Sequence, residues 1–217
     1  LLLVTYYFLA SGIIHPMFLK HRVEALSDGV FAIAMTLLIL DLKVPMGNEG
    51  PLSAALARDS HGWVSFAVSF LLAGVFWMHQ HRVFEAAAHW SKANLLLTFV
   101  FLGFISTLPF STSLWGHHLR DPLALTIYFG NQFVLALVLV IQVLVTIAQK
   151  HVNADAPPVG ELRLRLLGLT LGFGAAMIVA FYNVDYSGIV AIILIAAFRI
   201  VARRRYPKQH GEVRQHA

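Results

Sequence analysis

The sequence predicts an all-α integral membrane protein in which six helices cross the bilayer. Of the 217 residues, 58% are hydrophobic and only 12% are charged, whereas a soluble domain carries about 25% charged residues. The chain contains six apolar runs, each about 20 residues long, which is the length a helix needs to cross ~30 Å of hydrocarbon. The basic residues gather at the ends of these runs, where membrane proteins keep them, so the positive net charge does not indicate nucleic-acid binding.

The six spans are separated by stretches that contain polar residues, glycine and proline. We expect the spans at residues 24–44, 61–80, 93–115, 123–148, 162–182 and 188–202. Backbone N–H and C=O groups within lipid must be satisfied inside their own segment, so each run is predicted to be a helix. Short polar turns are expected between them, including the segment with Pro157 and Pro158, because proline cannot continue a helix.

The first residues of the chain allow three interpretations. Residues 1–19 are apolar and end in a His-Pro pair and a basic cluster. They are a short extra span, a segment resembling a signal peptide, or sequence upstream of a start at Met17. We therefore divide the chain into this N-terminal extension of uncertain status, a six-helix unit at 20–205 and a basic cytoplasmic tail at 206–217.

The distribution of positive charge predicts how the spans are oriented. If the N-terminus is cytoplasmic, 13 of the 16 Lys and Arg residues fall on the inner side and 3 on the outer side. This is the asymmetry that the positive-inside rule requires, and it places both termini in the cytoplasm. The run Arg203–Arg205 is then an anchor at the inner surface.

The first span differs from the other five because its inner end is polar. Residues 22–45 read RVEALSDGVFAIAMTLLILDLKVP. A charge inside a span costs roughly 2.5–3.5 kcal/mol, so Asp28 is expected to face protein or water. An alternative stays open, in which Ser27 and Asp28 cap the start of a helix.

An apolar stripe runs along the same span. Ile33, Leu37 and Leu40 lie within about 60° of one another on a helix, and Thr36 borders them. Such a stripe either packs against protein or lipid, or lines a pore. Asp41 follows the stripe and would form a ring of carboxylates at the outer mouth of a pore, or pair locally with Lys43.

Residues 22–40 resemble the first-helix signature of the transmembrane-protein-175 family, the lysosomal potassium channels and their prokaryotic relatives. That signature is an Arg, three variable residues and then Phe-Ser-Asp. Arg22, Ser27 and Asp28 match it, whereas Leu26 replaces the Phe.

The resemblance continues beyond the first span and covers about residues 20–205. It includes WMHQHR at 77–82, Asn94 followed by leucines, and the Leu-Pro-Phe sequence at 108–110. It implies a homotetramer in which the first helices line a potassium pore that has no TVGYG filter, in a prokaryotic inner membrane. It further implies that Ile33 forms the constriction.

The remaining site residues are also assigned through the resemblance. Leu37 and Leu40 would continue the lining, and Thr36 would contribute to the preference for potassium. A ring of four isoleucines can gate by dewetting, and ions that shed water readily pass it more easily, which favours potassium over sodium. A polar network of structural importance would comprise Arg22, Ser27, Asp28, Trp77, His79 and Asn94.

A filter-like sequence offers a competing pore. Residues 170–174 read TLGFG, and a pore loop there would leave five spans, with 9 basic residues inside and 7 outside. The other interpretation is close helix packing through Gly168 and Gly172.

The histidines suggest a metal site, but His79 and His117 lie near opposite membrane faces. We expect no metal, no cofactor and no catalytic residue. The predicted function is passive conduction of potassium by a tetramer, and its partners are a second copy of the chain, membrane lipid and the ion, without nucleic acid. The alternative is a secondary transporter for a small cation or solute, and an enzyme comes third.

Overall fold

A computed structural model of the chain describes residues 16–42, 53, 60–153 and 158–206. The helices in these ranges are α2 (Pro16–Leu37), the 3-10 helix η1 (Leu38–Asp41), α4 (Ser60–Ala86), α5 (Lys92–Ser106), α6 (Leu108–His117), α7 (Pro122–Ala148), α8 (Val159–Tyr182) and α9 (Val184–Arg205). Among these described residues, six helical stretches are long and apolar enough to cross a membrane. The predicted six-span, helical fold class is thereby confirmed at this level.

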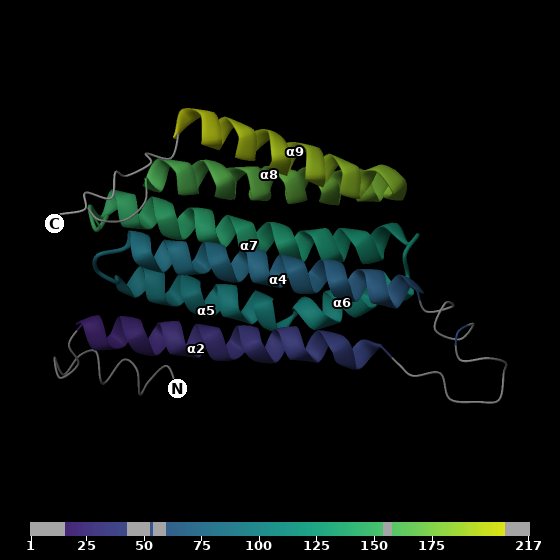
Figure 1. The fold of residues 1–217 in the computed structure, drawn as a ribbon, viewed down its shortest axis with the longest axis horizontal. Coiled ribbons are helices and arrows are strands. Elements are labelled where there is room, and N and C mark those ends of the chain that lie inside the picture. The colour runs from purple at the N-terminus through teal and green to yellow at the C-terminus, as the bar shows by residue number, and fades with distance from the viewer. Residues whose placement is uncertain (1–15, 43–52, 54–59, 154–157, 207–217) are drawn as a thin grey trace, which may run out of the picture.

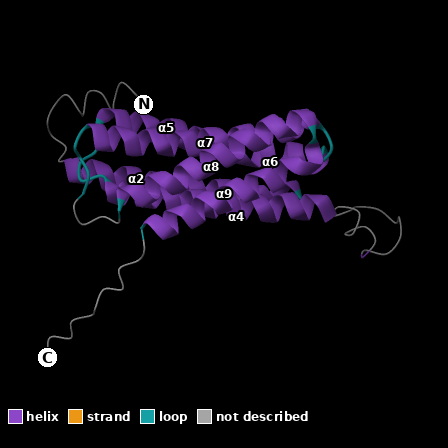
Figure 2. Cartoon of the chain, turned by 90° about the horizontal axis from the view of Figure 1, so that it is seen from above, coloured by secondary structure: helices purple, strands orange, loops and turns teal. Residues whose placement is uncertain are grey.

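The helices form one elongated bundle in which successive spans run in opposite directions (Figure 1), and all lie along a common axis when seen from above (Figure 2). Helices α2 and α9 lie at opposite edges of the bundle (Figure 1). Helix α8 packs on both α7 and α9, and α2 packs on α5 and α4. The start of α2 and the end of α9 lie at the same end of the bundle, as an even number of spans requires. We call this end the basic end, because α4, α8 and α9 place Arg82, Arg165 and Arg203–Arg205 there.

A row of five phenylalanines connects the helices through the core. Ring centroids are 6.0 Å apart for Phe31 and Phe101, and 6.4 Å apart for Phe101 and Phe76. The row continues from Phe76 to Phe173 at 6.2 Å and from Phe173 to Phe129 at 6.5 Å. Lipid tails are as apolar as these side chains, so the association of membrane helices depends on such close packing. The row therefore fixes α2, α5, α4, α8 and α7 against one another.

The third span is broken, although the sequence analysis predicted one continuous helix over 93–115. Helix α5 ends before Thr107 and α6 begins at Leu108, with Pro109 in its first turn. Proline has no N–H to continue the hydrogen-bond ladder, and its ring clashes with the preceding turn. The Thr107 hydroxyl donates to the Asn131 carboxamide oxygen of α7 at 3.1 Å, which holds the break against the bundle.

The filter-like sequence lies inside a continuous helix. Residues 170–174 belong to α8 (Val159–Tyr182) and do not form a loop. A Cβ atom on Gly168 would lie 2.4 Å from the Phe198 Cβ, and one on Gly172 would lie 2.7 Å from the Ile195 Cγ1. The pore-loop alternative is therefore wrong, and these glycines allow α8 and α9 to approach closely.

Several predicted boundaries shift. Helix α4 continues through Ala86, so residues 81–86, predicted as a loop, are helical. The predicted turn before the sixth span shortens to Asn183, whose side chain accepts a hydrogen bond from the Asp185 N–H at 3.1 Å and caps α9. Helix α2 already begins at Pro16. The interpretations of residues 1–15, the pairing of Asp41 with Lys43, and the tail at 207–217 lie outside the described residues.

Candidate functional site

One face of α2 is buried against its own subunit. The side chains of Val23, Ser27, Phe31, Ala34 and Leu38 are all less than 9% exposed. They follow one another at intervals of three or four residues, so they share a single face of the helix. This face packs on α4 and α5 and orients the rest of α2.

The exposed side of α2 and of the following η1 carries the predicted pore residues. Ile33 is 62% exposed, Leu37 43% and Leu40 70%. Thr36 is also exposed, and its hydroxyl donates to the Ile33 carbonyl oxygen at 2.8 Å. No helix of the described chain covers this face, so a single subunit leaves an apolar stripe bare along its first span.

A polar group joins α2 to α4 toward the basic end. The Trp77 indole N–H donates to an Asp28 carboxylate oxygen at 2.8 Å. The buried Ser27 hydroxyl donates to the Val23 carbonyl oxygen at 2.9 Å and accepts from the Gln80 amide at 3.4 Å. A cavity of about 100 Å³ adjoins this group and is lined by Asp28, Trp77 and Gln80 among others. Sequence analysis missed Gln80, although an amide inside an apolar span is itself a signal.

Of the other residues in the predicted network, His79 and Asn94 lie away from this polar group, and Arg22 lies on α2 itself. The His79 Nδ1 lies 2.8 Å from the Val75 carbonyl oxygen of its own helix, and His79 lines a cavity beside α8 and α9, away from α2. The Asn94 amide donates to the Thr146 hydroxyl of α7 at 3.1 Å. Arg22 lies on an exposed part of α2, two turns before Gly29. Only Trp77 thus meets Asp28 among the three candidates from the second and third spans.

Asn94 instead belongs to a second polar group that joins α5 to α7. The Gln142 amide donates to the Thr98 hydroxyl at 2.8 Å and to the Asn94 carbonyl oxygen at 3.3 Å. All four side chains, including Thr146, are buried. Sequence analysis missed Thr98, Gln142 and Thr146, although a glutamine in the middle of an apolar span demands a partner.

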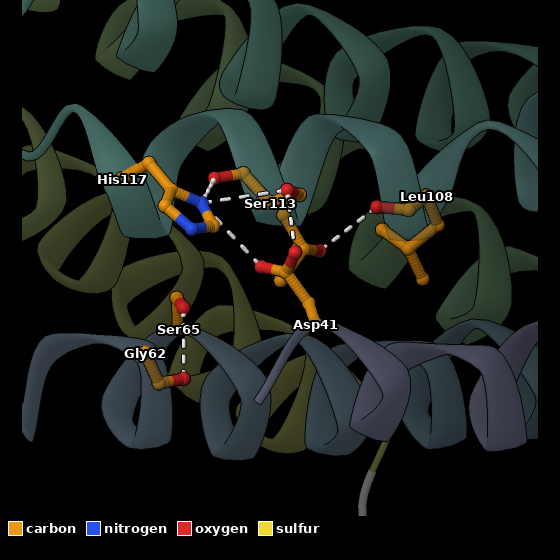
Figure 3. Close-up of polar contacts among 7 residues, drawn as sticks. Asp41, Gly62, Ser65, Leu108, Ser113 and His117 are labelled. Atoms are coloured by element: carbon orange, nitrogen blue, oxygen red, sulfur yellow. Dashed lines mark hydrogen bonds and ion pairs between the residues drawn. The ribbon is translucent and has the colours of Figure 1, made fainter. Parts of the chain in front are cut away.

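Asp41 is held at the other end of α2 by α6 (Figure 3). The Ser113 hydroxyl donates to one carboxylate oxygen at 2.8 Å, and the His117 Nδ1 lies 3.6 Å from the other. The Asp41 side chain is 30% exposed. The carboxylate is therefore anchored to α6 and still reaches solvent. Its partners Ser113 and His117 could not be read from the sequence, because they lie more than 70 positions away.

The arrangement offers an exposed apolar stripe on α2 and η1, with one carboxylate before it in the chain and one after it. Asp28 and Asp41 are separated by about 20 Å along α2, and the apolar side chains lie between them. Carboxylates concentrate cations, and an apolar stripe on a pore axis gates by dewetting. Within the described ranges, His, Asp and Glu side chains nowhere gather in groups of three that could hold a metal ion.

Helix α2 lies largely in a segment of the chain that is similar to a known protein family. Residues 22–109, which include α2, α4, α5 and the start of α6, match the family described as "Endosomal/lysosomal potassium channel TMEM175". A protein of Streptomyces collinus named as a potassium channel is 34% identical over 185 residues, which are 79% of this chain and 89% of that protein.

Two further comparisons extend this similarity. The human endosomal/lysosomal proton channel TMEM175 is 35% identical over 122 residues, which are 51% of this chain and 24% of the human protein. The crystal structure of a lysosomal potassium-selective channel TMEM175 homolog from Chamaesiphon minutus superposes with a TM-score of 0.73 at 26% identity. That match covers 84% of this chain and 97% of the other.

Proposed function

The chain belongs to the TMEM175 channel family, and we propose that it is a potassium-permeable channel of a prokaryotic cell membrane. The family is one of channels, so an enzymatic activity is not expected. The observation that carries the proposal is the bare apolar stripe of α2, which lies within the segment that matches the family. The chain has six helices that can cross a membrane and is similar to channel proteins, so we expect it to conduct ions down their gradient.

Four copies of the chain are proposed to surround the pore. The buried face of α2 is occupied by its own subunit, so only the exposed side can meet a common axis. Ile33 would form the constriction there, Leu37 and Leu40 would continue the lining, and Thr36 would bias the choice of ion. Three apolar rings, each of four side chains, hold water poorly, so an ion that sheds its hydration shell readily passes more easily. Potassium sheds water more readily than sodium, and modest selectivity follows.

The two polar groups of α2 are proposed to have different roles. Asp28 is bonded to Trp77, so it fixes α2 against α4 and serves as scaffold. Asp41 is anchored but partly exposed, so it would attract cations at the mouth. The basic end would be cytoplasmic by the positive-inside rule.

Recording from the purified protein in planar bilayers tests this function. Under bi-ionic conditions with potassium on one side and sodium on the other, we expect unitary currents whose reversal potential favours potassium. A saturable flux far below channel rates, without unitary events, would instead identify a secondary transporter and overturn the proposal.

Proton conduction is a second candidate, because the human relative is named as a proton channel. A pH gradient applied in the same bilayers, with potassium equal on both sides, separates the two. A reversal potential that follows the pH gradient indicates proton permeation, and one that stays at zero indicates potassium conduction without protons.

A further inference from the structure

A cavity of about 290 Å³ lies between α4, α8 and α9 near the basic end, away from α2. Three arginines face it, one from each helix: Arg82, Arg165 and Arg199. Its volume is at the lower limit of small-molecule sites, which measure roughly 300–1,000 Å³. The cavity can therefore take a headgroup and the start of an acyl chain, with the remainder of a lipid left in the bilayer.

The positive charges at this cavity are not balanced by the protein. Arg165 pairs with Glu161 on its own helix, but no acidic side chain of the described chain pairs with Arg82 or Arg199. The Nε atom of Arg165 is buried and has no hydrogen-bond partner among the described residues. A buried donor without an acceptor is costly, so an anion with several acceptor oxygens would satisfy the site.

The apolar lining begins one helical turn deeper than the arginines. Met78 precedes Arg82 by four residues on α4, and Ile195 precedes Arg199 by four on α9. Leu169 follows Arg165 by four on α8, which runs in the opposite direction. Each helix thus repeats one pattern, with a cation nearer the basic end and an apolar side chain one turn farther from it.

We propose that this cavity binds an anionic phospholipid from the leaflet at the basic end. The phosphate accepts hydrogen bonds from the three guanidinium groups, and the first carbons of an acyl chain contact Met78, Leu169 and Ile195. Basic pockets between membrane helices on the cytoplasmic side bind anionic headgroups in this way. A soluble anion would use the arginines and leave the apolar wall wet, so the pairing of both surfaces favours a lipid.

Native mass spectrometry of the purified, delipidated full chain tests the proposal without recording currents, so its outcome is independent of the channel function. The probes are phosphatidylglycerol, phosphatidylcholine and inorganic phosphate. We expect phosphatidylglycerol to bind in preference to the other two. A basic residue near an anionic lipid contributes about fivefold in affinity, so Arg82→Gln with Arg199→Gln should weaken binding roughly 30-fold.

Two further variants control for general charge and for folding. Arg203→Gln with Arg204→Gln removes the same charge from α9 outside the cavity and should leave phosphatidylglycerol affinity within about twofold. Met78→Trp keeps all three arginines and fills the apolar wall from a side chain that is half exposed, so it should reduce lipid binding while phosphate binding stays unchanged.

Three results would overturn the lipid site. Equal losses in the Arg203/Arg204 and Arg82/Arg199 variants would show diffuse surface attraction. Inorganic phosphate that competes fully with the lipid would show a soluble-anion site. A changed subunit number in the Arg82/Arg199 variant, with no lipid bound to the wild type, would show that a neighbouring subunit fills the cavity.

Discussion

Helices α2 and α9 lie at opposite edges of the bundle and both present apolar surface outward (Figure 1). On α9, Ile192 is 69% exposed, which is close to the 62% of Ile33 on α2. Ile192 lies eight residues after Val184, where α9 begins, and Ile33 lies eight residues before Asp41, where the 3-10 helix η1 that follows α2 ends. Exposure alone therefore does not distinguish a pore-lining helix from a lipid-facing one.

The two helices differ in how their polar residues are engaged. Asp28 of α2 bonds to Trp77 at 2.8 Å, and Asp41 of the following η1 bonds to Ser113 at 2.8 Å. On α9, Asn183 caps its own helix, and the arginines of the last turn are exposed. The rotation of α9 is fixed instead by apolar packing on α8, where Phe198 and Ile195 lie against glycines. The polar bonds of Asp28 and Asp41 add to the packing of α2 on α4 and α5, which decides which face is bare.

The largest effect should separate the two exposed isoleucines. Four Ile33→Asn side chains would wet the constriction, so conductance should rise roughly tenfold or more, equivalent to about 1.4 kcal/mol of barrier, and selectivity should fall. Single-channel recording measures both.

Ile192→Asn is the matched control for that variant. The same substitution at the same depth on α9 should leave the conductance of the folded variant equal to that of the wild type. If Ile33→Asn leaves the currents as they are, or if both variants raise them equally, α2 does not line the pore.

Assembly should be the next most sensitive property. Asp28→Ala removes the hydrogen bond from the partly exposed Trp77 N–H, which costs about 0.5–1.5 kcal/mol per subunit. The tetramer fraction in size-exclusion chromatography should fall, whereas Asp185→Ala at the exposed start of α9 should not change it. An intact Asp28→Ala tetramer with altered ion preference would assign Asp28 to the ion path.

A smaller effect is expected from the hydroxyl of Thr36. Thr36→Val keeps the shape of the side chain and removes the hydroxyl, so the potassium-to-sodium permeability ratio should fall about threefold, equivalent to roughly 0.6 kcal/mol. Ser187→Ala on α9 removes a hydroxyl with the same bond to the carbonyl three residues earlier, and the ratio should stay constant. Bi-ionic reversal potentials measure both, and equal ratios for wild type and Thr36→Val would remove Thr36 from selectivity.

The smallest effect concerns the anchoring of Asp41. Ser113→Ala removes a hydrogen bond worth about 0.5–1.5 kcal/mol but leaves the carboxylate in place, so potassium conductance at low salt should change less than twofold. Ser106→Ala removes a hydroxyl that bonds only within α5 and serves as the control. A loss of all current in Ser113→Ala, with folding intact, would show that Asp41 is more than an attractor at the mouth.

Part of the site followed from sequence because its signal is local. The charge of Asp28 within an apolar run and the spacing of Ile33, Leu37 and Leu40 are visible without neighbours. The assignment of partners is not local. Trp77 and His79 are two positions apart, which is about 200° on a helix, so only one of them can face α2. The structure gives that position to Trp77 and turns His79 toward α8 and α9.

The sequence by itself determined that the chain lies in a membrane, how many spans it has and that they are helical. Hydropathy and length are properties of each segment alone, so they can be read without knowing its neighbours. The sequence did not determine how the break at Pro109 is held in the bundle, since the Asn131 side chain of α7 that bonds the Thr107 and Ser111 hydroxyls on either side of the break lies 20 or more positions along the chain. Nor did it determine which side of α2 is bare. Apolar residues surround that helix, so only packing against α4 and α5 decides which of them are covered and leaves Ile33 exposed.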